Sequence, residues 1–315
     1  MEPSQTEVHE PTTSSVHDAP PPIAAPFTET APQTVSPQAC PSCGTAPAAN
    51  IPNVPAAPLP PSFVYAIGNI EARFPNMGAE KEFAQALARI DAKGLNEHRA
   101  RHSVLTKPEN LYLLRQQCFV MTIRGLETYI VMPRNPSDYH LLAETIRANP
   151  SPADLDVVIG MRGPIAPPQM CNGLMVPVVA FDQTYSFDRP TLLKSMPRAN
   201  GTSEKDFEAT AGELLDRVLQ MTDSAGSFDE HRALNYLAVR YPAIYHKTAE
   251  AHGENKSLTS VHVQRSRLSG VRNVHDVIFT YTHRTTDVAE KHFVRVDVTD
   301  EFPFLVTKLS PYYDV

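Results

Sequence analysis

Hydrophobic positions divide the chain after residue 62 into strand-like and helix-like segments. Short runs rich in β-branched and aromatic residues predict strands early in this region, in its middle and in its last third. The predicted strands are residues 63–74, 118–123, 127–132, 155–161, 174–181, 258–264, 274–281 and 291–298. The Arg124-Gly125 pair between the second and third strands predicts a tight hairpin turn.

Helical spacing of apolar residues predicts three helices, over residues 79–93, 204–222 and 227–242. Gly94 is placed to supply a left-handed cap at the end of the first helix. Thr202 or Ser203 is expected to cap the start of the second helix. Ser227 and Glu230 have the spacing of a capping box at the start of the third.

The order of these elements indicates the fold class. Strands lie at both ends of the region with helices between them, and no regular β-α-β repetition is present, which favours an α+β fold over a doubly wound sheet. The last three strands are separated by loops containing Ser, Gly and Asn, which predicts an antiparallel meander. We therefore expect antiparallel sheets with a C-terminal β-meander and a central group of helices in one domain over residues 63–315.

Residues 1–62 differ sharply in composition. They contain half of the 30 prolines and no Lys or Arg, since Arg73 is the first basic residue of the chain. Their charges are all acidic: Glu2, Glu7, Glu10, Asp18 and Glu29. Such a segment has too little apolar bulk to offset its ordering entropy, so we expect a disordered Pro/Ala-rich tail.

The charge balance restricts the partners of the folded part. Subtracting the five acidic tail residues from the net charge of −7 leaves −2 for residues 63–315, too close to neutral for a nucleic-acid footprint. No 18-residue apolar stretch predicts a membrane span, and the N-terminus has neither the basic nor the apolar region of a secretory signal. We expect a cytoplasmic protein that binds neither nucleic acid nor membrane.

The cysteines suggest a metal site. Cys40-Pro41-Ser42-Cys43-Gly44 resembles half of a zinc knuckle, in which two thiolates on one tight turn hold one edge of a tetrahedron. The remaining cysteines, Cys118 and Cys171, could complete a structural zinc site with Cys40 and Cys43. Free thiols and a redox-active pair stay open as alternatives. Bound zinc would fasten the tail to the domain.

Other candidate chemistry is fragmentary, so the sequence contains no recognisable catalytic or cofactor-binding set. Cys171 follows a proline-rich loop and could be a nucleophile, with one of 12 histidines as its base and Glu127 as a further group, or it could be a buried structural thiol. His275, His283 and His292 lie on or beside neighbouring C-terminal strands and could meet at a metal, or they could be ordinary surface residues. Serine-hydrolase and phosphate-loop motifs are missing from the sequence.

Several stretches of the folded part resemble the C-terminal domain of PatG-type cyanobactin maturation proteins. They include Tyr65-Ala66-Ile67-Gly68, Gly125-Leu126-Glu127-Thr128-Tyr129, Arg162-Gly163-Pro164-Ile165-Ala166-Pro167-Pro168, Met170-Cys171-Asn172-Gly173-Leu174-Met175, Ala233-Leu234-Asn235-Tyr236-Leu237 and Thr299-Asp300-Glu301-Phe302-Pro303-Phe304. In that family the domain follows a subtilisin-like protease that cuts or macrocyclises a ribosomally made precursor peptide. The protease triad is not recognisable in this chain, so proteolysis and macrocyclisation are not carried over.

The resemblance implies an accessory, non-catalytic domain in the maturation of ribosomally synthesised and modified peptides. Its expected partners are a precursor peptide or a processing enzyme, with a homodimer as a further possibility. Two alternatives remain. One is an enzyme with a site around Cys171, and the other is a zinc-stapled structural or dimerisation module.

Overall fold

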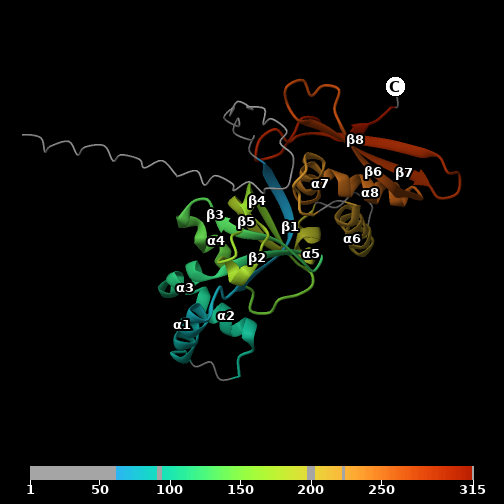
Figure 1. The fold of residues 1–315 in the computed structure, drawn as a ribbon. Coiled ribbons are helices and arrows are strands. Elements are labelled where there is room, and N and C mark those ends of the chain that lie inside the picture. The colour runs from blue at the N-terminus through green and yellow to red at the C-terminus, as the bar shows by residue number, and fades with distance from the viewer. Residues whose placement is uncertain (1–61, 91–93, 197–202, 222–223, 314–315) are drawn as a thin grey trace, which may run out of the picture. The chain divides into compact units, whose positions relative to one another are not determined.

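A computed structural model describes residues 62–90, 94–196, 203–221 and 224–313 of the chain. The predicted tail, including Cys40 and Cys43, lies outside the described residues apart from Ser62. The described part contains two β-sheets, and its helices form two groups (Figure 1).

The first sheet is a closed five-stranded barrel with the order β1-β2-β3-β5-β4. Its strands are β1 (Phe63–Arg73), β2 (Cys118–Ile123), β3 (Leu126–Pro133), β4 (Asp154–Ile165) and β5 (Pro177–Asp188). All neighbours are antiparallel except β3 and β5, which are parallel. A bulge between Ile159 and Gly160 bends β4, and a Cβ at Gly160 would lie 2.3 Å from the Ala180 carbonyl oxygen, so only glycine fits this bend.

The second sheet is the predicted C-terminal meander. It consists of β6 (Lys256–Arg265), β7 (Val274–His283) and β8 (Ala289–Asp297), with the two-residue strands β9 (Phe304–Leu305) and β10 (Ser310–Pro311) beside β8. Both β6–β7 and β7–β8 are antiparallel. The long strands therefore confirm the predicted topology.

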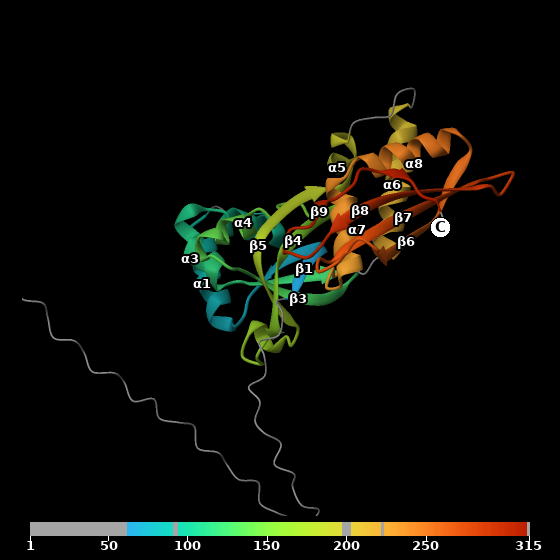
Figure 2. The ribbon, with the colours of Figure 1, turned by 90° about the horizontal axis from the view of Figure 1, so that it is seen from above.

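The helices divide between the two sheets. The barrel group is α1 (Met77–Ala88), α2 (Glu97–Leu105), α3 (Leu111–Gln116) and α4 (Tyr139–Ala143), and the second group is α5 (Arg189–Ser195), α6 (Glu204–Met221), α7 (Asp229–Arg240) and α8 (Ala243–Gly253). Figures 1 and 2 show the first group gathered beside the barrel and the second group beside the C-terminal sheet. None of the described helices is both long and apolar enough to cross a bilayer.

Strand β1 is buried on both faces, which explains its nearly continuous apolar sequence. Val64, Ala66 and Ile70 belong to the apolar cluster of the barrel and its helices, whereas Tyr65 and Ile67 pack outward toward Tyr236 and Val239 of α7. Burial and the neighbouring Tyr185 hydroxyl, 2.7 Å away, raise the pKa of Tyr65, so it stays a neutral phenol.

Residues 224–226 join the barrel to the C-terminal half. The N–H of Tyr65 donates to the Gly226 carbonyl at 3.1 Å, and the N–H of Ile67 donates to the Ser224 carbonyl at 2.9 Å. The Asn235 side chain, fully buried on α7, donates to the Tyr65 carbonyl at 2.7 Å. The carbonyls of this short turn thus accept from two amides in the first half of β1.

Two details of the predicted helices are wrong. The third predicted helix, α7, begins at Asp229 with Phe228 as its N-cap and no side-chain cap bond, so Ser227 and Glu230 form no capping box. The first, α1, ends at Ala88, where the Arg89 N–H bonds to the Ala86 and Leu87 carbonyls, and Gly94 is therefore not its cap. By contrast, Ser203 does cap α6, since its hydroxyl accepts from the Asp206 N–H at 3.2 Å.

Candidate functional site

A cleft opens where β1 leaves the barrel ladder. The pairing of β1 with β4 ends at Gly68 and Asp156, but β1 continues to Arg73, paired on its other side with β2. The space between the second half of β1 and residues 145–154 forms a cleft of 680 Å³, which is lined by β1, α2, β2 and that segment.

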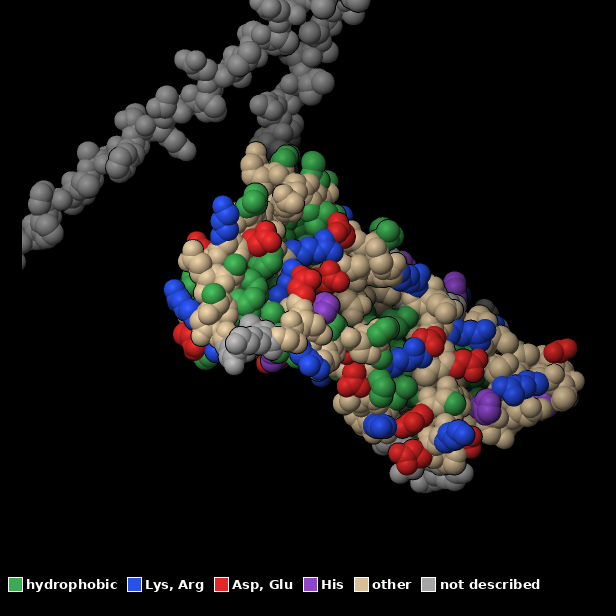
Figure 3. All heavy atoms as spheres, turned by 90° about the horizontal axis from the view of Figure 1, so that it is seen from below, with side chains coloured by type: hydrophobic (Ala, Val, Ile, Leu, Met, Phe, Trp, Pro, Cys, Tyr) green, Lys and Arg blue, Asp and Glu red, His purple; other side chains and the backbone are tan. Residues whose placement is uncertain are grey.

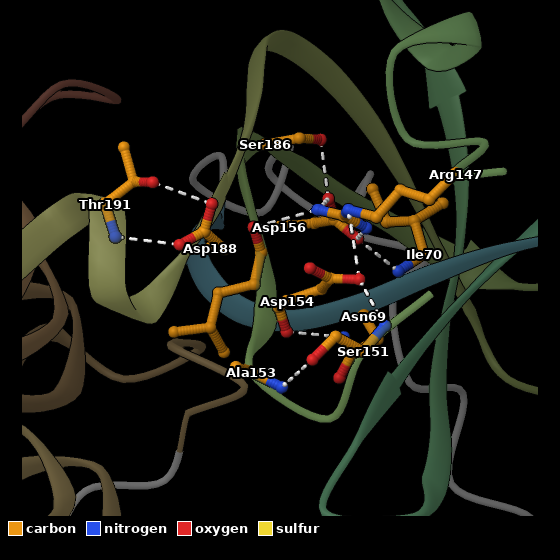
Figure 4. Close-up of polar contacts among 11 residues, drawn as sticks. Asn69, Ile70, Arg147, Ser151, Ala153, Asp154, Asp156, Ser186, Asp188 and Thr191 are labelled. Carbon is orange, nitrogen blue, oxygen red and sulfur yellow. Dashed lines mark hydrogen bonds and ion pairs between the residues drawn. The ribbon is translucent and has the colours of Figure 1, made fainter. Parts of the chain in front are cut away.

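Asp156 organises one end of this cleft from inside the protein. Its side chain is fully buried, and its carboxylate accepts from the Ile70 N–H at 2.7 Å, the Ser186 hydroxyl at 2.6 Å and the Arg147 guanidinium at 2.8 Å (Figure 4). A buried carboxylate is tolerated when it is paired and fully hydrogen-bonded, as here.

Side chains bind backbone groups on the open edge of β1, where no neighbouring strand of the described chain pairs with them. Asp156 binds the N–H of Ile70, and Arg101 from α2 donates to the Ala72 carbonyl at 2.6 Å. An exposed strand edge is normally a template for adding another strand, and capping its polar groups with charged side chains blocks that pairing. A ligand in the cleft would therefore contact side chains more than the β1 backbone.

The loop that precedes β4 is fixed to the same network. The Ser151 N–H donates to the Asp154 carboxylate at 2.7 Å, and the Asn69 amide donates to the Asp154 carbonyl at 2.7 Å (Figure 4). At the far end of β5, Asp188 caps α5 by accepting from the Thr191 N–H and hydroxyl, which lowers the pKa of the Asp188 carboxyl.

The charges in the cleft are matched. Arg73 pairs with Glu71 and Glu127, Arg101 pairs with Glu97, and Arg147 pairs with Asp154 and Asp156. The outermost carboxylates are Glu71 and Glu97, whose side chains are 58% and 73% exposed. The face drawn in Figure 3 likewise shows acidic and basic side chains interspersed, without a field of one sign.

Two buried polar atoms of cleft residues have no hydrogen-bond partner within the described part of the chain. They are Nε of Arg101 and Oγ1 of Thr122. Buried polar groups without a partner are uncommon in folded proteins. Their presence in residues that line one cleft favours this cleft as a place where a further polar group is accommodated.

The structure brings together two of the four cysteines that the sequence suggested as zinc ligands. Cys118 at the start of β2 and Cys171 in the loop between β4 and β5 form a disulfide, with Cα atoms 5.5 Å apart. Cys40 and Cys43 lie outside the described residues. The four-cysteine zinc site thus stays a prediction, and it requires Cys118 and Cys171 in their reduced form.

The pieces suggested for an enzyme site are dispersed. The sulfur of Cys171 is bonded to the sulfur of Cys118. No His or carboxylate is among the described residues that line the cavity beside it. Glu127 instead pairs with Arg73 at the other cleft. The proline-rich stretch that ends at Pro168 continues β4 as far as Ile165 and then forms the loop that holds Cys171.

The C-terminal histidines do not converge. Within the ranges that the structure describes, no group of three or more His, Cys, Asp or Glu side chains is placed to hold a metal ion. His275 and His292 are buried on β7 and β8, where desolvation lowers their pKa values. His283 lies at the end of β7, with its ring 3.1 Å from the Thr285 hydroxyl.

The charged residues that shape the cleft were not predicted from sequence patterns. Asp154 and Asp156 flank Leu155 at the start of an apolar run, and an acidic residue inside such a run signals a buried, paired carboxylate. Arg147 follows α4, a short helix that periodicity did not reveal. Its partnership with Asp156 is set by the tertiary fold.

These features define an α+β domain in which a closed barrel carries a charge-paired cleft and adjoins a helix-covered meander. Residues 201–312 match a family model described as PatG C-terminal. A solved structure titled "PatG Domain of Unknown Function" has the same fold, with 18% sequence identity, a TM-score of 0.65, and coverage of 80% of this chain and 98% of that one. No curated protein matches the chain. The C-terminal part of the chain is therefore similar to the PatG C-terminal family, and the described part shares the fold of that solved domain.

Proposed function

We propose that this protein is a non-catalytic docking domain in the maturation of ribosomally synthesised peptides, of the cyanobactin type, and that it binds an extended segment of a precursor peptide in the cleft along β1. The observation that supports this proposal is the cleft itself, which lies beside a strand edge where side chains already bind the Ile70 N–H and the Ala72 carbonyl. A cytoplasmic location is part of the same proposal.

The size and chemistry of the cleft suit a short peptide segment. Its 680 Å³ lies within the range of about 300 to 1,000 Å³ typical of ligand sites. Amide, hydroxyl and paired charged groups line it, including Asn69, Thr122 and Ser151. A peptide can match such mixed groups with its own amides, whereas a phosphate or nucleic-acid ligand would require unpaired basic groups.

Site-specific photocrosslinking tests the location. A benzophenone amino acid replaces the exposed His98, which lines the cleft on α2, and in a matched control it replaces the exposed Glu109, which does not. Each full-length protein is irradiated with a synthetic precursor peptide, and the products are identified by mass spectrometry. We expect crosslinking from position 98 only. Equal labelling from both positions, or none, would contradict the cleft as the peptide site, and turnover of the peptide by the protein alone would refute the non-catalytic role.

Zinc and dimer formation are separate parts of the proposal. Metal analysis of protein purified with a reductant should show zinc that Cys40→Ser removes, if the four cysteines form the predicted site. A metal-free and equally stable wild type would rule that site out.

A homodimer could form through β6. This strand has an outer edge that pairs with no other strand among the described residues, and such an edge can pair with a second copy. Analytical ultracentrifugation measures the association.

A further inference from the structure

The Cys118–Cys171 disulfide lines a small cavity on the barrel surface. The cavity has a volume of 200 Å³ and is bounded by α3, β2, β3 and the loop that carries Cys171. Cys118 is 5% exposed inside an apolar cluster, whereas Cys171 is only partly buried. An incoming group would therefore reach the sulfur of Cys171 first.

Among the described residues, the only charged one that lines this cavity is basic. Arg115 of α3 is exposed, and no Asp or Glu is among the lining residues. The side chains of Gln169 and Tyr139 add uncharged hydrogen-bonding groups. The cavity therefore favours a small anionic ligand with amide groups.

The loop at Cys171 has an unusual backbone. Cys171, Asn172 and Gly173 are three successive residues with φ of 50°, 55° and 86°. The left-handed region is unfavourable for residues with a side chain, so tertiary contacts must hold this loop in place. The disulfide is the covalent bond that ties the loop to β2.

We propose that the Cys118–Cys171 disulfide is a thiol-exchange site for anionic low-molecular-weight thiols, and that exchange frees the loop at Cys171. The thiolate attacks Sγ of Cys171, a new S–S bond forms between the small thiol and Cys171, and the bond to Cys118 breaks. The proton that the incoming thiol loses ends on Sγ of Cys118. Disulfide count is conserved, and Cys118 becomes a neutral thiol that suits its apolar surroundings.

Mass spectrometry with glutathione tests the site. Full-length protein with Cys40→Ser and Cys43→Ser keeps only the pair of interest and is incubated with reduced glutathione. We expect one glutathione adduct, mapped to Cys171, together with faster amide hydrogen exchange over residues 166–176. An adduct on Cys118, no adduct, or two free thiols before any treatment would overturn the proposal.

The dependence of the exchange rate on the charge of the thiol distinguishes a specific site from a disulfide that is merely exposed. Arg115→Gln should slow the reaction with glutathione by about fivefold, the effect of removing one charge a few ångströms from an anion in water. The same variant should leave the rate with cysteamine, a cationic thiol, unchanged or faster. Equal slowing with both thiols would show that Arg115 acts through the structure, and it would overturn the anionic preference.

Discussion

At the scale of single residues, the buried Asp156 side chain holds together three separate parts of the chain. It is fully buried, yet it satisfies a β1 amide, a β5 hydroxyl and the guanidinium of Arg147 at once. Removing one partner of a buried ion pair leaves the other charge uncompensated and the amide without an acceptor. The Ile70 amide on the open edge of β1 thus depends on this one carboxylate.

Asp156→Ala should therefore lower the free energy of unfolding by about 3 kcal/mol. Ser186→Ala, which removes only one of the hydrogen bonds to the same carboxylate, should cost about 1 kcal/mol. Urea denaturation of both variants measures the difference. Equal losses in the two variants would contradict the central role of Asp156.

Glu301 is a second informative residue. The Arg134 guanidinium bridges it to Asp182 of β5, at 3.1 Å and 2.7 Å. Burial, together with the Asp182 carboxylate, raises the pKa of Glu301 to about 7, from 4.5. The native state therefore binds this proton more tightly than the unfolded state does. The resulting stabilisation is complete below pH 4.5 and is lost as the pH rises through 7.

Glu301→Gln removes this ionisation while keeping the shape of the side chain. Between pH 5 and pH 8 the variant should gain stability relative to the wild type, because only the wild type places a second charge beside Asp182 at high pH. Urea midpoints measured across this range test the prediction, with the exposed Glu109→Gln as control. Curves for wild type and Glu301→Gln that stay parallel would disprove it.

At the scale of elements, the turn at residues 224–226 packs against β1 only because Gly226 permits the close approach. Gly226 has φ of 58°, and a Cβ there would lie 1.9 Å from the Tyr65 carbonyl oxygen. Both the backbone angle and the close approach exclude a side chain. The junction therefore rests on the smallest residue in it.

Gly226→Ala should destabilise the protein by about 3 kcal/mol and speed amide exchange at Tyr65 and Ile67. Gly253→Ala, at the end of α8 with open space around it, should change stability by less than about 1 kcal/mol. Thermal unfolding and hydrogen exchange report both effects. A Gly226→Ala protein as stable as the control would contradict the prediction, because the segment at residues 224–226 would then accommodate a side chain beside β1.

At the scale of the whole molecule, Asn235 links the C-terminal half to the barrel. Its side-chain amide donates to the Tyr65 carbonyl at 2.7 Å and to the Ser224 carbonyl at 3.4 Å. Arg232 on the same helix donates to the carbonyls of Val298, Asp300 and Glu301. Helix α7 therefore contacts β1, the 224–226 segment and the end of the meander, and we expect the described part to unfold cooperatively.

Asn235→Ala should cost about 2 kcal/mol, because it leaves the buried Tyr65 carbonyl without its side-chain donor. Exchange protection should fall in β1 and in α7 together. Asn149→Ala, which removes an exposed bond from Arg99, is the control and should have little effect. A loss of protection confined to α7 would show that the two halves unfold independently.

Much of the fold could be predicted from the chain itself. The hairpin turn follows from the Arg124-Gly125 pair, and the long strands follow from runs of β-branched and aromatic residues. The α6 helix follows from apolar residues at helical spacing. Short helices such as α3 and α4 were not predicted, because one or two helical turns contain too few residues to show a periodic apolar pattern. Helix α8 was overlooked because Pro242, its N-cap, reads as a helix end.

The sequence by itself determined the α+β class and the order of the long elements. Only the tertiary structure decided that the first strands close into a barrel, that Cys118 meets Cys171, and that Asp156 and Arg101 cap the free edge of β1. The physical reason is that local patterns report which face of an element is buried, whereas these features join residues far apart in the chain, whose proximity depends on how the buried faces pack together.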